Sequence, residues 1–272
     1  MKFTHEEMLE RGYKLVFEDH FDGPDLDPEV WHKNDIFYEK GHMDRRIHRN
    51  PENCFTKDSC MVIKGSINEE ENGEKTYNCG IVQVKNFCYK YGYAEARARI
   101  AVAGPGIWMG FWTKSDYKGS KINSEIDICE MFGDDSVIAS NVHGWWQDRN
   151  YGLIHRYNFL DGNNYPKAKK LPDGQRYSDE FHRFGYFWTP EYIEFLVDGE
   201  CHCHIDITNP MFALCHTPVY FLFSMLYGST FVPQPDENRT EPIEFCIDYL
   251  RLYQDDNGEL FDLDAEGIHK RK

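Results

Sequence analysis

Three acidic residues lie close together in the segment 124–130, which reads SEIDICE. Glu125 and Asp127 are two residues apart, so a regular β-strand points both side chains to the same side. Glu130 follows Glu125 by five residues, an odd number that would place it on the opposite side of a regular strand. A β-bulge at Ile128 and Cys129 adds the one residue that restores the parity, and bulges are frequent beside active sites. The segment therefore predicts three carboxylates on one face.

Paired carboxylates on one face can hydrolyse a glycosidic bond. When two such groups lie about 5 to 5.5 Å apart, one attacks the anomeric carbon while the other protonates the leaving oxygen, and the anomeric configuration is retained. Glu125 and Glu130 are predicted to form this pair. Asp127, between them, would keep the proton on the acid through like-charge repulsion and a hydrogen bond. The alternative is a solvated acidic strand, because the chain has 46 acidic residues to place.

Two tryptophans lie upstream of the acids, in the run GIWMGFW at residues 106–112. Trp108 and Trp112 are four residues apart in a segment with the composition of a strand. Because pyranose rings bury their C–H faces against aromatic rings, both are predicted to bind substrate. Core packing is the alternative, since large aromatic side chains are often buried.

Alternation of apolar and polar residues with period two indicates the elements that position these residues. Residues 94–100 have alanine or isoleucine at every second position, and residues 193–197 alternate in the same way before a hairpin turn at Asp198 and Gly199. In residues 243–250 the alternation predicts a strand with four residues on one side: Ile243, Phe245, Ile247 and Tyr249. Many short strands closed by turn residues, without a βαβ rhythm, predict an all-β fold, a β-sandwich jelly roll.

The two ends of the chain differ from this pattern. Thr4 followed by Glu7 forms a capping box, which predicts a short helix within residues 1–13. Residues 254–272 lose the alternation and are expected to form a surface tail. No segment has the composition of an interdomain linker, so we expect a single domain over residues 1–272.

The charge of the chain limits its partners. Its formal net charge is −16 at pH 7. A field of that sign repels phosphate backbones and anionic lipid surfaces, so no nucleic acid and no membrane is expected as a partner, and we expect a monomer. No run approaches the roughly 18 apolar residues of a membrane span. The first residues carry acids where a signal peptide needs an apolar core, so the chain as given is expected in the cytoplasm, or secreted if a leader has been removed.

Several motifs, in order along the chain, resemble those of glycoside hydrolase family 16. The acidic segment is similar to the family's strand of the form Glu-hydrophobic-Asp-hydrophobic-hydrophobic-Glu. Further similar runs are residues 15–31 (LVFEDHFDGPDLDPEVW), 91–100 (YGYAEARARI), 181–199 (FHRFGYFWTPEYIEFLVDG) and 247–253 (IDYLRLY). The resemblance implies a concanavalin-like jelly roll with an open cleft on its concave sheet.

The resemblance also implies roles for individual residues. Glu125 corresponds to the nucleophile, Glu130 to the acid/base and Asp127 to an assisting acid. The longer strand, with Cys129 in the bulge, is similar to that of laminarinases, agarases and carrageenases rather than to the shorter strand of lichenases and xyloglucan transferases. His143 stands where laminarinase-like members have a cleft histidine, so we expect it beside Asp127 on the next strand.

A structural metal site is implied in the same way. Asp248 resembles the strand position that supplies a calcium ligand in many family members. The chain departs from the family pattern in the partner loop, where Ser59 and Cys60 stand in place of the usual glycine. We therefore expect no required cofactor, with a structural calcium ion at Asp248 as the one candidate.

Together these observations predict a retaining endo-β-glucanase that cleaves internal β-1,3 or mixed β-1,3-1,4 bonds of a β-glucan polysaccharide. An agarase- or carrageenase-type galactan hydrolase is the alternative within the family, and sulfated galactans would call for basic residues in the cleft. Arg45, Arg46 and Arg49 form a small basic cluster, which we interpret as part of a solvated loop. A catalytically inactive carbohydrate-binding jelly roll is the alternative outside catalysis. The crowding of three acids favours the enzyme.

Overall fold

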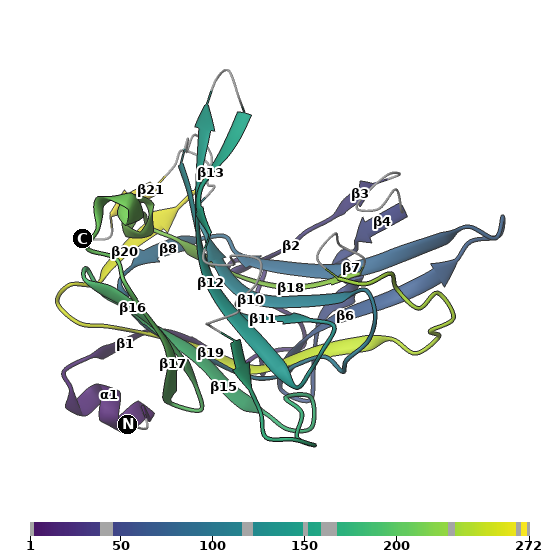
Figure 1. Ribbon diagram of the computed structural model, residues 1–272, viewed down its shortest axis with the longest axis horizontal. Coiled ribbons are helices and arrows are strands. Elements are labelled where there is room, and N and C mark those ends of the chain that lie inside the picture. The colour runs from purple at the N-terminus through teal and green to yellow at the C-terminus, as the bar shows by residue number, and fades with distance from the viewer. Residues whose placement is uncertain are drawn as a thin grey trace.

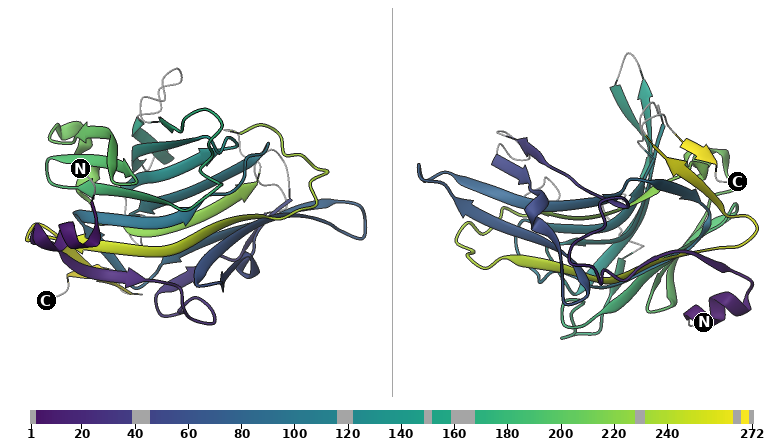
Figure 2. Two further views of the ribbon diagram at one scale, coloured as in Figure 1. Left: turned by 90° about the horizontal axis from the view of Figure 1, so that it is seen from below. Right: turned by 180° about the vertical axis from the view of Figure 1, so that it is seen from behind.

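The computed structural model describes residues 3–38, 46–115, 122–148, 152–158, 168–227, 232–264 and 268–270. Its strands form two strongly curved layers packed face to face, and almost all neighbouring strands are antiparallel (Figures 1 and 2). The predicted all-β jelly roll is thereby confirmed.

The inner sheet carries the concave face of the molecule. Its central strands are, in spatial order, β2 (Trp31–Lys33), β7 (Lys75–Val84), β18 (Tyr220–Tyr227), β10 (Ile107–Lys114), β11 (Ile122–Phe132) and β12 (Val137–Asp148). At one end β12 pairs with β13 (Gly152–Asn158) and β14 (Ala168–Lys170), and at the other β7 pairs in parallel with β4 (Arg46–Arg49), which pairs with β3 (Ile36–Tyr38). The β12–β13 and β3–β4 pairs rise on opposite sides of the concave face in Figure 1.

The outer sheet covers the back of the inner one. It contains, in spatial order, β17 (Glu200–Asp206), β16 (Tyr192–Val197), β15 (His182–Trp188), β9 (Gly92–Arg99) and β19 (Ile243–Gln254). On the edge away from β9, β19 pairs with β1 (Lys14–Asp19) and with β6 (Cys60–Glu69). β6 also pairs with β5 (Cys54–Lys57). The hairpin of β6 and β7 joins the two sheets. Within the described residues, the 3-10 helices η2 (Pro51–Asn53) and η3 (Pro210–His216) lie in the connections.

The predicted alternation is confirmed in β9 and in the β16–β17 hairpin. Asp198 and Gly199 both have positive φ angles, of 52° and 79°, as a tight two-residue hairpin turn requires. The alternating apolar residues of both segments are buried in the structure: Ala94, Ala96, Ala98, Ile100, Ile193, Phe195 and Val197.

The alternation predicted for β19 is wrong after Ile247. Between Ile247 and Tyr249 the strand advances two residues while its neighbour β9 advances one, so Asp248 occupies a bulge. The bulge reverses the parity that the sequence pattern suggested. Leu250 is consequently buried, whereas Tyr249 is only half-buried and its hydroxyl donates to Oε1 of Glu95 at 2.8 Å.

The predicted surface tail is also wrong in part. β20 (Glu259–Leu263) pairs with β8 (Phe87–Lys90) and with β21 (Ile268–Lys270), which makes a separate three-stranded sheet. The side-chain amide of Gln254 donates to the carbonyl oxygens of Lys90 and Glu259 and so ties the start of this segment to β8. The segment is held because three of its apolar side chains pack against the main core: Leu260, Phe261 and Leu263.

The predicted N-terminal helix is present as α1 (His5–Glu10). Thr4 and Glu7 form the expected capping box, and Met8 is fully buried in a cluster on the outer sheet. Among the described residues, no helix is long and apolar enough to cross a membrane.

Candidate active site

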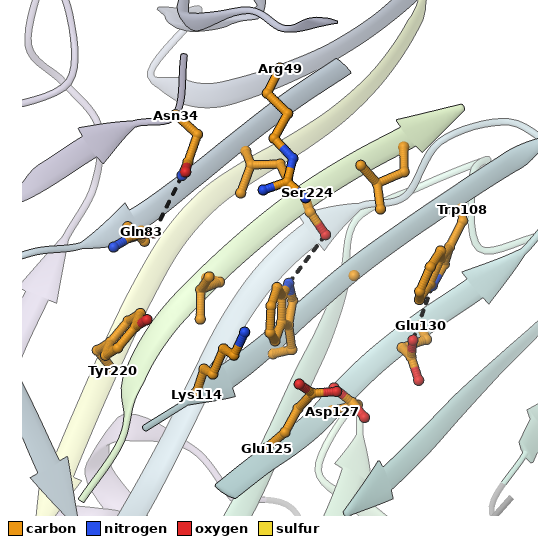
Figure 3. A pocket seen from close by; sticks show the side chains of 15 residues that line it. Asn34, Arg49, Gln83, Trp108, Lys114, Glu125, Asp127, Glu130, Tyr220 and Ser224 are labelled. Atoms are coloured by element: carbon orange, nitrogen blue, oxygen red, sulfur yellow. Dashed lines mark hydrogen bonds between the residues drawn. The ribbon is translucent and has the colours of Figure 1, made fainter. Parts of the chain in front are cut away.

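A cleft of about 380 Å³ opens on the concave face of the inner sheet (Figure 3). Residues of β10 and β11 line one part of it, and residues of β18, β7 and β4, together with Asn34 between β2 and β3, line the rest. The three acids and the two tryptophans singled out in the sequence all lie in this cleft.

The predicted bulge in β11 is confirmed, and it explains how the acids come together. Between Asp127 and Glu130, β11 advances three residues while β12 advances two. The register with β10 shifts at the same place. The extra residue therefore lies at Ile128 and Cys129, and Glu125, Asp127 and Glu130 all line the cleft (Figure 3).

Glu130 has the electrostatic environment of a proton donor. Its side chain is buried, and this burial raises the pKa of its carboxyl well above the usual value, with a further rise from the charges of Asp127 and Glu125. The indole Nε1–H of Trp108 donates to Oε1 of Glu130 at 3.0 Å, a bond that lowers the pKa in part. A carboxyl group with a raised pKa holds a proton near neutral pH and can give it to a leaving group.

Glu125 occupies a different position from Glu130. It is half-buried, and its strand neighbours are Lys114 on β10 and His143 on β12. A carboxylate that remains reachable from the cleft, two residues from the buried Asp127, suits attack on a bound molecule.

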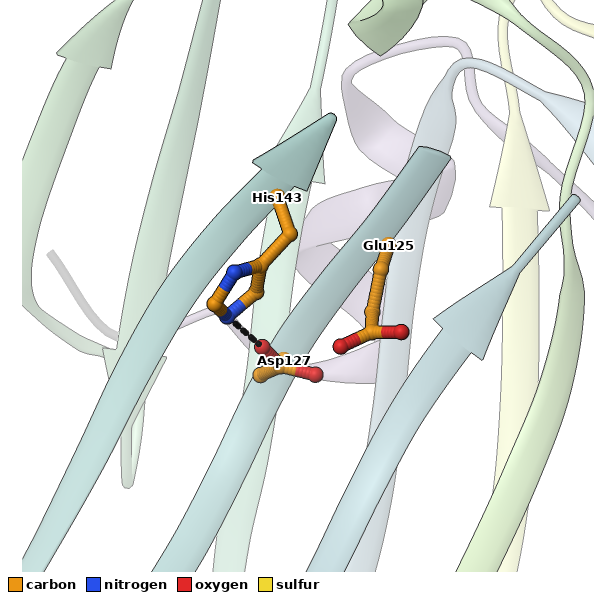
Figure 4. A group of neighbouring side chains, drawn as sticks. All are labelled: Glu125, Asp127 and His143. Atoms are coloured by element: carbon orange, nitrogen blue, oxygen red, sulfur yellow. Dashed lines mark ion pairs between the residues drawn. The ribbon is translucent and has the colours of Figure 1, made fainter. Parts of the chain in front are cut away.

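His143 contacts Asp127, as expected, although the two residues are not direct strand partners. The main chain of His143 pairs with Glu125, while its ring reaches diagonally so that Nε2 lies 3.1 Å from Oδ2 of Asp127 (Figure 4). Nδ2 of Asn141 lies 2.9 Å from the same ring nitrogen. Asn141 was not predicted, although a polar residue two positions before His143 must share its face of β12.

Among the described residues, the one group of side chains that could hold a metal ion is found at this site. Ligand atoms of Glu125, Asp127 and His143 lie within 4.8 Å of one another. Asp248, the residue predicted to bind calcium, lies on β19 in the outer sheet, and its Oδ2 accepts a hydrogen bond from Arg97 at 2.6 Å. A calcium ion there would share this carboxylate with a guanidinium group, and the calcium site stays a prediction.

Both predicted tryptophans line the cleft and are half-buried. Nε1 of Trp112 donates to Oγ of Ser224 at 3.1 Å, and Trp108 donates to Glu130. These bonds fix the orientation of each indole while part of each ring stays accessible from the cleft. The positions therefore suit stacking against a sugar, and they are not those of fully packed core residues.

The basic cluster is divided in the structure. Arg49 lies in the cleft, where Lys114 adds a second cation, so its interpretation as a loop residue is wrong (Figure 3). The reason is the parallel pairing of β4 with β7, which brings this short strand to the end of the cleft. Arg46 instead forms an ion pair with Glu74 at 3.1 Å, and Arg45 lies outside the described residues.

Comparison with known families agrees with this geometry. A family model described as "Beta-porphyranase A-D, GH16 domain" matches residues 15–254. The chain belongs to glycoside hydrolase family 16. The matched span of this family 16 domain includes every cleft residue named above, whereas α1, β20 and β21 lie outside it.

Three known proteins are similar to most of this family 16 chain. The glucan endo-1,3-beta-glucosidase A1 of Niallia circulans is 23% identical over 274 residues, covering 90% of this chain but only 38% of that protein. The beta-glucanase of Rhodothermus marinus is 25% identical over 259 residues, covering 89% of this chain and 85% of that protein. The laminarinase catalytic domain of Thermotoga maritima MSB8 superimposes with a TM-score of 0.69 at 25% identity, covering 90% of this chain and 99% of that one.

Proposed function

We propose that this family 16 domain is a retaining endo-hydrolase of a β-linked polysaccharide, with β-1,3-glucan as the first candidate substrate. The observation that carries the proposal is the bulge in β11, because it directs Glu125 and Glu130 into one cleft with Asp127 between them. The cleft residues lie on a curved sheet, and a cleft in that position supports cleavage at internal bonds of a long chain lying across it.

The proposed reaction has two steps, in which Glu125 forms and then loses a covalent bond to the sugar while Glu130 first gives up a proton and then regains one. In the first, Glu130 donates its proton to the glycosidic oxygen while the Glu125 carboxylate attacks the anomeric carbon. The carbon–oxygen bond breaks, and an ester joins the remaining sugar to Glu125. In the second, the Glu130 carboxylate takes a proton from water, whose oxygen attacks the same carbon and releases Glu125. Both residues return to their starting protonation states.

Asp127 is the proposed assisting acid. Its negative charge contributes to the raised pKa of Glu130, which keeps the proton in place until the glycosidic oxygen can receive it. The contact of His143 with Oδ2 of Asp127 fixes this carboxyl group in the middle of the site.

Two substrate classes have support of different kinds. The similar proteins named above are described as a glucan endo-1,3-beta-glucosidase, a beta-glucanase and a laminarinase, which supports β-1,3-glucan. Arg49 and Lys114 in the cleft, together with the porphyranase description of the matching family model, support a sulfated galactan as the second candidate. Guanidinium groups bind sulfate-like oxyanions through several hydrogen bonds, whereas a neutral glucan gives them no charge to pair with.

A substrate screen with an Arg49→Ala variant is expected to separate the two candidates. We expect new reducing ends from laminarin, and we expect Arg49→Ala to change laminarin hydrolysis by less than about threefold, because a neutral glucan gives the guanidinium group no charge to pair with. The screen measures reducing ends released from laminarin, lichenan, agarose, κ-carrageenan and porphyran. Activity confined to porphyran or κ-carrageenan, with a loss of tenfold or more (about 1.4 kcal/mol) in Arg49→Ala, would replace the glucan by the sulfated galactan.

The stereochemistry of the first product is a second expected result. Because Glu125 and Glu130 share one wall of the cleft, the bond should be cleaved by double displacement, and the sugar released first should be the β-anomer. Inverting hydrolases need about 6.5 to 9.5 Å between their carboxyl groups to hold a water molecule. Proton NMR of the early reaction mixture distinguishes the anomers, and an initial α-anomer would contradict the nucleophile assignment.

A further inference from the structure

A buried hydroxyl group lies behind the β11 bulge, on the side away from the cleft. Three alternate residues of β12, Ile138, Ser140 and Val142, are no more than 1% exposed, and Ile138 and Val142 belong to the core between the two sheets. Ser140 is the polar member of this row. It is also the single β12 residue that stands opposite the two bulge residues, Ile128 and Cys129.

Two hydrogen bonds connect this hydroxyl group to the bulge and to the other sheet. Ser140 Oγ–H donates to the main-chain carbonyl oxygen of Ile128 at 2.7 Å. Since the hydroxyl has one proton, its oxygen is the acceptor for Nε2–H of His202, 3.3 Å away. His202 comes from β17, where the register with β16 also shifts by one residue. The two bonds therefore run from the outer sheet to the bulge of the inner one.

The protonation state of the His202 ring agrees with donation from its Nε2–H to Ser140. Burial lowers the pKa of His202 to about 4, so the ring is neutral at neutral pH and carries one proton. Its Nδ1 has no hydrogen-bond partner within the part of the chain that the structure describes. The proton therefore belongs on Nε2, where it has an acceptor, and the ring serves as a donor to Ser140.

The position of Ser140 makes its hydrogen bond sensitive to the shape of the bulge. A hydroxyl group between apolar neighbours costs free energy unless it is paired. The proton of the Ser140 hydroxyl has its acceptor only while the Ile128 carbonyl stays where the bulge places it. The same bulge sets the parity of Glu130 relative to Glu125.

We propose that Ser140, supported by His202, is a positioning residue that fixes the β11 bulge and thereby the separation of Glu125 and Glu130. The proposal rests on the function proposed above, and it assigns neither residue a contact with the substrate. Ser140 acts through the main chain of Ile128 alone.

Comparison of Ser140→Ala with Thr113→Val tests this role. Thr113 is an equally buried hydroxyl residue that donates to another β11 carbonyl, that of Ile126 at 3.3 Å, where the register is regular. With laminarin as the probe, we expect Ser140→Ala to lower kcat about 10- to 100-fold with KM changed less than about twofold, because misplacement of a reacting group by about 1 Å has effects of this size. The alkaline limb of its pH profile should move to lower pH, since separated carboxylates repel less. Thr113→Val should keep the kcat and the pH profile of the parent.

The possible outcomes distinguish this proposal from the function on which it rests. Unchanged kcat in Ser140→Ala, or equal losses of kcat in both variants, would overturn the positioning role, provided that melting curves show folded proteins. If Glu125→Gln is inactive on laminarin while Ser140→Ala is fully active, only the positioning role fails. If Glu125→Gln hydrolyses laminarin like the parent, the proposed function itself fails.

Discussion

Replacement of Glu125 by glutamine is expected to lower kcat at least about 10³-fold while the fold is retained. The amide has nearly the shape of the carboxylate but is a far weaker nucleophile and cannot form the proposed ester. Because Glu125 is half-buried at the cleft surface, the change should alter the melting temperature by no more than a few degrees. Reducing ends released from laminarin, or from the polysaccharide that the screen identifies, measure the effect.

Glu194→Gln provides a matched control for this variant. Glu194 also lies on a β-strand and contacts a histidine, with Oε1 2.9 Å from Nδ1 of His204, but it is on the outer sheet. We expect it to keep full activity. Parent-like activity in a folded Glu125→Gln protein would remove Glu125 from the mechanism.

Replacement of Glu130 by glutamine is expected to lower kcat by about 10² to 10⁴, the range for loss of a general acid. The pH profile carries more information than the size of this loss. Because Glu130 is the proposed proton donor, activity should require its protonated carboxyl. Since the pKa of this carboxyl is raised, activity should be present at lower pH and lost as pH rises through that pKa. In Glu130→Gln the residual activity should lack this alkaline limb. An alkaline limb that persists unchanged in the variant would assign the proton donor to another residue.

The same raised pKa also predicts how stability depends on pH. The folded state binds the Glu130 proton more tightly than the unfolded chain, so the free energy of unfolding falls as pH rises through the raised pKa. Glutamine is neutral at every pH and does not have this dependence. The melting temperature of Glu130→Gln at about pH 8 should therefore exceed that of the parent. A lower melting temperature at this pH would mean that the buried charge is stabilised in the folded state.

Two bulges of the same kind differ in how far the sequence could predict them. The bulge at Ile128 and Cys129 was predictable because two glutamates expected to act together are an odd number of residues apart. The bulge at Asp248 was not, because the residues of β19 include apolar side chains of both parities, and an unbroken alternation ending at Tyr249 fits as well. The choice between these registers is made by packing against β9, which is a long-range contact.

Cleft residues outside β11 were difficult to predict for the same reason. Arg49 reaches the cleft because β4 pairs in parallel with β7, and Ser224 because β18 pairs with β10. Neither pairing has a local sequence signal. The position of Asn141 could have been predicted from that of His143, since residues two apart share one face of a strand. The tail after Gln254 carries no strand signal of its own, because its few apolar residues become strand-forming only against β8.

The placement of all three acids on β11 also affects how the site responds to heat. This strand is hydrogen-bonded along both edges, to β10 on one side and to β12 on the other, so its amide groups can exchange with solvent only when a central part of the sheet opens. Loops and chain ends open at much lower free energy. The spacing of the acids should therefore persist up to the temperature at which the inner sheet itself comes apart, and thermal inactivation should coincide with global unfolding.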